Sequence, residues 1–190
     1  MILFLCSLIL IIFCHEFAHL LVAKKCGCGV DVFSIGFWKP FYRKEYKGTI
    51  YQISFLLLGG YCKLRDELTN SQDSQSFTNQ PYHKKVLIAL AGVTTNMIIG
   101  LLILYLGRLF HINKLIYFGY LSFLLGATNA LPFPALDGSY PILVWLEKFY
   151  GKEKGYKLMG IICRIGFIIL IVLQVACIPW IINLIKNGGL

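Results

Sequence analysis

Four long stretches of almost uninterrupted apolar residues dominate this sequence. They cover about residues 2–23, 86–106, 115–136 and 161–185, and each can cross roughly 30 Å of hydrocarbon as a helix that rises about 1.5 Å per residue. Hydrophobic residues make up 57% of the chain and charged residues 14%, with a mean hydropathy of +0.70, whereas soluble domains carry about 25% charged residues. The sequence therefore predicts an α-helical polytopic membrane protein with about four transmembrane helices. The first stretch has no basic segment before it and no Ala-x-Ala cleavage site, so we expect a retained helix.

The positive charges fall mostly on one side of these stretches. Ten lysines and arginines lie between the first and second stretches and four between the third and fourth, but only three lie on the opposite side. Because cytoplasmic loops are enriched in Lys and Arg, we predict a multi-pass protein of a bacterial cell membrane with both termini outside and loop 24–85 in the cytoplasm. This topology accounts for the net charge of +9, so we expect no nucleic-acid partner.

Residues 15–19, inside the first stretch, read HEFAH. Two histidines four residues apart share one helix face, and with the glutamate between them they form the signature of zinc metalloproteases. The motif predicts His15 and His19 as zinc ligands and Glu16 as the general base that takes a proton from water. A catalytic zinc takes three protein ligands and keeps one position open, so a further ligand is needed.

Asp137 is the best candidate for that ligand. Seven of the nine acidic residues lie in loops or at the predicted interfaces, and the two others are Glu16 and Asp137, at the end of the third stretch. An ionisable group at membrane depth is costly unless it is paired. Both stretches run from outside to inside in the predicted topology, which brings His15, His19 and Asp137 toward the cytoplasmic leaflet. We therefore predict one Zn²⁺ per chain at these three side chains.

Two other classes of protein remain open at this point. One is a metal-binding membrane protein such as a transporter, and the other is a catalytically inactive protein that binds transmembrane helices. A transporter would be expected to carry further ligands along a path, and this sequence offers one cluster. An inactive protein would be expected to lack a ligand or the base, and none is missing.

The motifs taken together resemble the site-2 protease family of intramembrane zinc metalloproteases. HEFAH is followed far downstream by NALPFPALDG (129–138), and FSIGF (33–37), GGYCKL (59–64) and AGVTTN (91–96) are similar to the family's intervening segments. The resemblance implies a zinc endopeptidase that acts on a single-span membrane-protein substrate within the bilayer. It also implies one catalytic core over 1–190, without a PDZ or CBS domain. Leu57 and Val93 replace prolines of the family, and Ser139-Tyr140 replaces its frequent Gly-Arg.

The remaining segments suggest how a substrate is held. Residues 48–64 are rich in β-branched and aromatic residues, which predicts a membrane re-entrant β-hairpin with a turn at Gly59-Gly60. Its edge would pair with an unwound substrate, although a purely structural hairpin at the interface is the alternative. Pro132 and Pro134 should break the third helix before Asp137, and the resemblance favours Asn129 as a donor to substrate or to the oxyanion.

Two other segments have sequence patterns typical of membrane helices. Asn96 with its small neighbours in AGVTTN favours close helix packing, and residues 139–150 predict an interfacial helix. The oligomeric state is left open.

Overall fold

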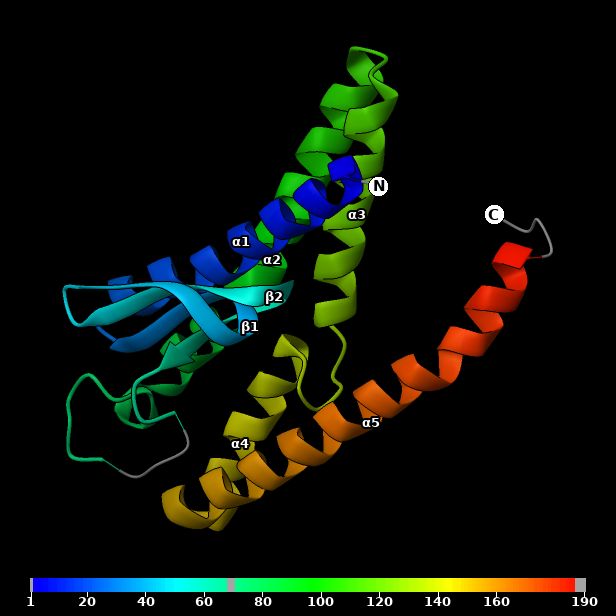
Figure 1. Cartoon of the computed structure of the whole chain (residues 1–190). Helices are drawn as coiled ribbons and strands as arrows, with labels where there is room; N and C mark the ends of the chain where they lie inside the picture. Colours follow the sequence, from blue (N-terminus) through cyan, green and yellow to red (C-terminus); the bar gives the residue numbers. More distant parts are fainter. Residues whose placement is uncertain (1, 68–70, 187–190) are drawn as a thin grey trace.

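The computed structural model of the chain describes residues 2–67 and 71–186 (Figure 1). It is mostly helical, with one long β-hairpin between the first two helices and two short 3₁₀ turns. The elements are α1 (Ile2–Lys25), β1 (Val30–Tyr46), β2 (Thr49–Leu64), η1 (Phe77–Asn79), α2 (Tyr82–Leu109), α3 (Asn113–Asn129), η2 (Asp137–Ser139), α4 (Tyr140–Tyr150) and α5 (Lys152–Lys186).

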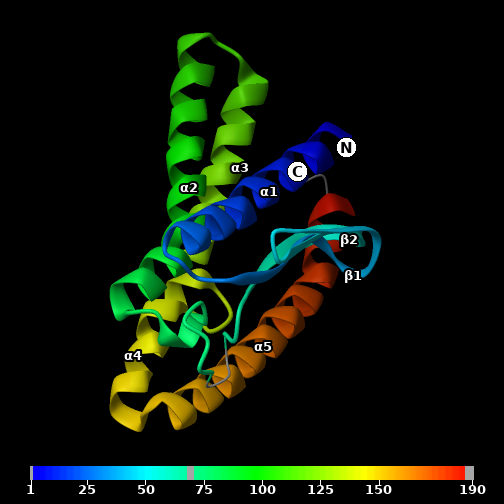
Figure 2. The ribbon, with the colours of Figure 1, turned by 90° about the vertical axis from the view of Figure 1, so that its left-hand side faces the viewer.

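Helices α2 and α3 form an antiparallel pair, and α1 crosses α2 (Figures 1 and 2). The pair is close because glycines lie between the two backbones. A Cβ on Gly100 would stand 2.6 Å from the Phe123 nitrogen, and a Cβ on Gly119 would stand 2.8 Å from the Leu104 nitrogen. Small residues of this kind allow close packing of helices in a membrane.

Three helical segments are long and apolar enough to cross a membrane within the described residues: Leu5–Lys25, Tyr82–Leu109 and Lys152–Val172. The third predicted span differs, because α3 has 17 residues, which correspond to about 26 Å of helix. It ends at Asn129, not near residue 136. The predicted helix break is confirmed, and its cause is the pair Pro132 and Pro134, which cannot continue the backbone ladder.

The start of the fourth predicted span also differs between the sequence prediction and the structure. Helix α5 begins at Lys152, nine residues before the predicted start at 161, because polar residues of the preceding segment continue the same helix. The expected helix over 139–150 is present as α4, and Gly151, with φ of 75°, separates it from α5. Helix α5 packs on α4 near its start and then extends away from the other helices (Figure 1).

The structure contains a β-hairpin between α1 and α2, but residues 48–64 supply only its second strand, and its turn is not where the sequence predicted it. Gly59-Gly60 lies inside β2, and the chain turns at Lys47-Gly48, where both residues have positive φ. Tyr46 pairs with Thr49 beside this turn. The prediction was wrong because a Gly-Gly pair also occurs at close backbone contacts and at bulges. In this hairpin the pair lies at a close contact with α1 and next to a bulge.

β2 contains a bulge next to these glycines. The register pairs Ile35 with Gly60 but Phe37 with Leu56, so β2 carries two more residues than β1 over this interval. Bulges bend a strand and redirect its side chains and backbone. Near the base of the hairpin, α1, α2 and the sheet enclose an apolar core: Leu20, Ala23, Cys28, Val30, Phe33, Leu64, Phe77 and Ile88. This core fixes the hairpin against the face of α1 that carries HEFAH.

Candidate metal centre

His15 and His19 lie one turn apart on α1, and both rings face the interior of the molecule. Their centroids are 4.9 Å apart, and only 6% and 8% of the two residues is exposed. The i, i+4 spacing predicts this arrangement, because residues four apart stand above one another on a helix. Buried imidazoles need polar partners, and the structure supplies them from two other segments.

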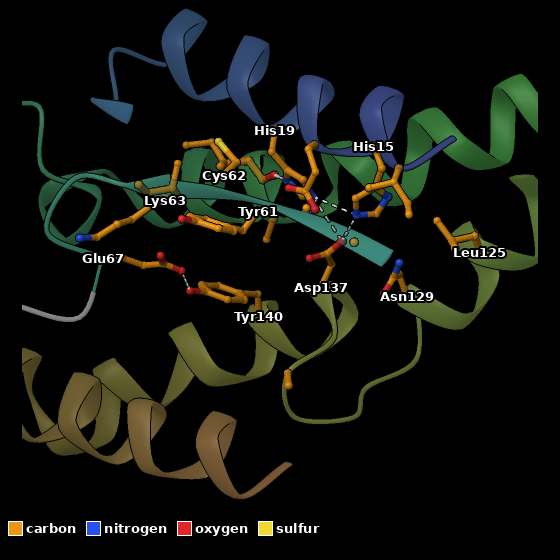
Figure 3. Close-up of a pocket in the computed structure, with 18 of the residues that line it drawn as sticks. His15, His19, Tyr61, Cys62, Lys63, Glu67, Leu125, Asn129, Asp137 and Tyr140 are labelled. Carbon is orange, nitrogen blue, oxygen red and sulfur yellow. Dashed lines mark hydrogen bonds and ion pairs between the residues drawn. The ribbon is translucent and has the colours of Figure 1, made fainter. Parts of the chain in front are cut away.

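Asp137 reaches the histidines from a segment more than a hundred residues away. After α3 ends, the chain makes a compact turn in which Ala135 has φ of 80°, and Gly138 packs so closely that a Cβ there would stand 2.1 Å from the Ala130 oxygen. The turn places Asp137 at the first position of η2. Its Oδ2 atom lies 2.8 Å from His15 Nε2 and 3.3 Å from His19 Nε2 (Figure 3).

These three atoms fit the requirements of a zinc ion. His15 Nε2 and His19 Nε2 are 3.3 Å apart, and the ligand atoms of His15, His19 and Asp137 all lie within 4.8 Å of one another. Zinc–ligand bonds of 2.0–2.2 Å in a tetrahedron separate the ligand atoms by about 3.3 Å. Two of the three separations match this value, and the third is the shorter hydrogen bond between His15 and Asp137.

Helix α2 holds both histidines from behind. His19 Nδ1 donates to the Ile88 carbonyl oxygen over 2.7 Å, and the Asn96 amide lies 3.2 Å from His15 Nδ1. Between them, Gly92 leaves room for the rings, because a Cβ there would stand 2.5 Å from Nε2 of both His15 and His19. Each Nε2 atom is thereby directed toward Asp137.

A pocket of about 590 Å³ lies beside the cluster. It is lined by all seven residues that the sequence singled out: His15, Glu16, His19, Gly59, Gly60, Asn129 and Asp137. Its other walls are mostly apolar and aromatic, including Leu8, Ile12, Phe37, Tyr61 and Leu125. Figure 3 shows Asn129 and Asp137 on the same side of the pocket, opposite the HEFAH helix.

The two glycines of β2 bring this strand against α1 at the glutamate of the motif. A Cβ on Gly60 would stand 2.9 Å from Glu16 Cγ and 2.9 Å from the Ser34 oxygen. A Cβ on Gly59 would collide with the ring of Phe37.

A third carboxylate, that of Glu67, also lines the pocket. Glu67 accepts a hydrogen bond from the Tyr140 hydroxyl, which ties the segment after β2 to the start of α4 (Figure 3). Burial raises the pKa of Glu67 to about 7, although the charge of Lys63 acts in the opposite direction. This group can therefore change its protonation near neutral pH.

Sequence reasoning missed several contributors to the site. Asn96 was interpreted as a helix-packing residue, and Gly92 and Glu67 were given no role at the site. A signal was present in α2, since Ile88, Gly92 and Asn96 recur every four residues and so share one face. Nothing local pointed to Glu67, whose partner Tyr140 is 73 residues away.

Comparison with known proteins agrees with this geometry. The chain belongs to peptidase family M50, the site-2 protease family, whose model matches residues 3–113 and 107–173. A Campylobacter jejuni protein named as a zinc metalloprotease is 40% identical over 111 residues, which cover 55% of this chain and 30% of that protein. Protease RseP of Yersinia pestis and the regulator of sigma-E protease RseP of Escherichia coli are each 37% identical over 103 residues, covering 52% of this chain and 23% of theirs. The chain thus spans less than a third of the length of these relatives.

Proposed function

We propose that this protein is an intramembrane zinc endopeptidase of a bacterial membrane. It hydrolyses a peptide bond in or near the transmembrane segment of a single-span membrane protein, from the cytoplasmic side of the bilayer. The observation that carries the proposal is the convergence of His15, His19 and Asp137 from segments 122 residues apart in the sequence, beside a pocket that Glu16 also lines. The apolar walls of that pocket suit a substrate taken from lipid.

Each polar residue has a role that follows from its position. His15 Nε2, His19 Nε2 and Asp137 Oδ2 would hold a single zinc ion, which when bound lowers the pKa of water and polarises a carbonyl. The Glu16 carboxylate takes the proton of the attacking water and returns it to the leaving nitrogen. The Asn129 amide donates to the substrate carbonyl oxygen as negative charge develops there.

The substrate must lose its helical hydrogen bonds before its peptide bond can be attacked. The β2 bulge and the glycine pair Gly59-Gly60 bring an extended backbone to the rim of the pocket. An unwound substrate segment can pair with such a strand, and the backbone bonds would replace those of its helix. This is the reason to assign the hairpin a role in binding substrate in addition to its contribution to packing.

The test is co-expression with candidate single-span membrane proteins. The wild-type protein should release a new fragment, and Glu16→Gln should abolish it while zinc content stays unchanged. General-base catalysis contributes about 10²–10⁴-fold, so the variant should cleave at least about 100-fold more slowly. Equal cleavage by both proteins would exclude Glu16 as the base. Bound zinc without cleavage of any substrate would favour a metal-binding or inactive helix-binding protein.

A further inference from the structure

The face of α2 that backs the two histidines offers a different partner to each ring. His19 Nδ1 lies 2.7 Å from the Ile88 carbonyl oxygen, which can only accept a hydrogen bond. The proton of His19 is therefore held on Nδ1, and its Nε2 lone pair is free. His15 Nδ1 faces the Asn96 side chain instead, at 3.2 Å. An amide can either donate or accept at that position.

Asn96 is placed for a specific task. It is fully buried, and its Oδ1 atom has no hydrogen-bond partner among the described residues, while Nδ2 points at His15 Nδ1. Amide oxygen and nitrogen are nearly isosteric, so their placement follows the hydrogen-bond network. A rotation of 180° about the Cβ–Cγ bond exchanges the two atoms, so that Oδ1 faces His15 Nδ1 and can accept its proton, and Nδ2 takes the position without a partner.

The orientation of the Asn96 amide matters because the Asp137 carboxylate favours the opposite tautomer of His15, with the proton on Nε2. Asp137 Oδ2 is 2.8 Å from His15 Nε2, and a carboxylate that close favours a proton on Nε2. A neutral imidazole carries one proton. If that proton stays on Nε2, the same nitrogen cannot ligate a metal ion.

We propose that Asn96 is a positioning residue that accepts the Nδ1 proton of His15 on Oδ1 and so keeps Nε2 free for the metal. The inference rests on the function proposed for this site and replaces the interpretation of Asn96 as a packing residue. Together, Asn96 and the Ile88 carbonyl make α2 the element that selects the tautomer of both histidines. Metal-ligating histidines commonly donate their second N–H to an oxygen in this way.

Three variants separate this role from packing. Asn96→Leu removes the acceptor at similar volume, and Asn96→Asp keeps it. Ser122→Ala is the matched control, because Ser122 Oγ donates to the Asn96 backbone oxygen over 3.0 Å and does not touch His15. Zinc affinity would be measured in detergent by competition with a chelating indicator, and the tautomer of His15 by ¹⁵N chemical shifts of labelled histidines.

We expect Asn96→Leu to weaken zinc binding about 10- to 100-fold, and Asn96→Asp and Ser122→Ala to bind zinc within a fewfold of wild type. Unchanged affinity in Asn96→Leu would overturn the inference. An equal loss in all three variants would also overturn it, because packing would then explain the effect. If the wild-type protein binds no zinc, the proposed function fails, and the ¹⁵N shifts still decide the inference. An Nδ1–H signal of His15 that moves to Nε2–H in Asn96→Leu supports it, and an unmoved signal contradicts it.

Discussion

At the scale of single residues, a side chain that is missing shapes the site as much as those that are present. Gly92 faces both Nε2 atoms at a distance where a methyl group does not fit, since its Cβ would stand 2.5 Å from each. Rings displaced by even a fraction of this distance no longer converge with Asp137. The absence of a side chain is therefore part of the candidate metal centre.

We predict that Gly92→Ala loses zinc while the protein remains folded. Its matched control is Gly100→Ala, because Gly100 contacts the Phe123 backbone on α3 instead of the histidines. The control should lower the melting temperature and leave zinc content near that of wild type. Metal analysis and thermal melting of both purified variants give the comparison, and full zinc content in Gly92→Ala would contradict the prediction.

Glu67 leads to a prediction about pH. Burial raises the pKa of Glu67 from 4.5 to about 7, so the folded protein keeps a proton that the unfolded chain has released. Between these two pH values the unfolded state binds fewer protons, and stability falls as pH rises. Below about 4.5 the group costs no stability, and above about 7 the loss is complete.

Glu67→Gln should remove this loss, because its neutral amide oxygen still accepts from the Tyr140 hydroxyl. The variant should therefore melt at a higher temperature than wild type above pH 7 and at the same temperature below pH 4.5. Thermal melting of both proteins in detergent across this range measures the difference. A constant offset at all pH values would show that another group carries the titration.

At the scale of elements, the β-hairpin differs between its two ends. Its base belongs to the apolar core around Phe33 and Leu64, and its bulge lines the pocket. The outer half is exposed and carries both aromatic and basic side chains: Trp38, Lys39, Phe41, Tyr42, Arg43, Lys44, Tyr46 and Lys47. Side chains of this mixture suit a membrane–water interface, so the part proposed to enter the bilayer is the inner half.

We predict that the bulge is the part of the hairpin that binds substrate. Deletion of Leu57 and Leu58 would remove the two extra residues of β2. The β1 segment from Ile35 to Phe37 could then pair with β2 in a regular register. Cleavage should be lost while zinc stays bound, because the metal centre does not include these residues. The length-preserving double variant Leu57→Ala/Leu58→Ala is the control and should retain cleavage. Normal cleavage by the deletion variant would rule out the role of the bulge.

At the scale of the whole molecule, the candidate metal centre joins segments that are far apart in the sequence. α1, α2 and the turn after α3 meet at His15, Asn96 and Asp137. A ligand that binds only the folded state stabilises it in proportion to its affinity and concentration. Zinc should therefore act on the stability of the fold as well as on catalysis.

We predict about one zinc per purified chain, and a clear drop in melting temperature when a chelator removes it. In Asp137→Ala, zinc should bind more weakly and the same chelator should change the melting temperature much less. Metal analysis with melting curves before and after chelation tests both statements. A zinc content near zero in freshly prepared wild-type protein would undercut the proposed mechanism.

The features that the sequence determined by itself are those encoded over a few residues. Apolar stretches require helices in lipid because backbone groups there must be bonded internally, HEFAH places two imidazoles on one face, and Pro132 and Pro134 end α3 wherever it packs. Asp137 could be predicted as a ligand because an unpaired carboxylate at membrane depth is costly and needs a partner. These inferences depend on local geometry and on the cost of burial.

Only the tertiary structure decided how the second nitrogen of each ring is held, where the hairpin turns and what surrounds the pocket. Asn96 and Gly92 acquire their roles because α2 crosses α1 at one depth, and a different crossing would leave them as packing residues. Gly59-Gly60 lies within a strand because Gly60 must pass against Glu16 and Ser34. Such choices depend on contacts between distant segments, and the same short sequence is compatible with a turn, a bulge or a close contact until those segments meet.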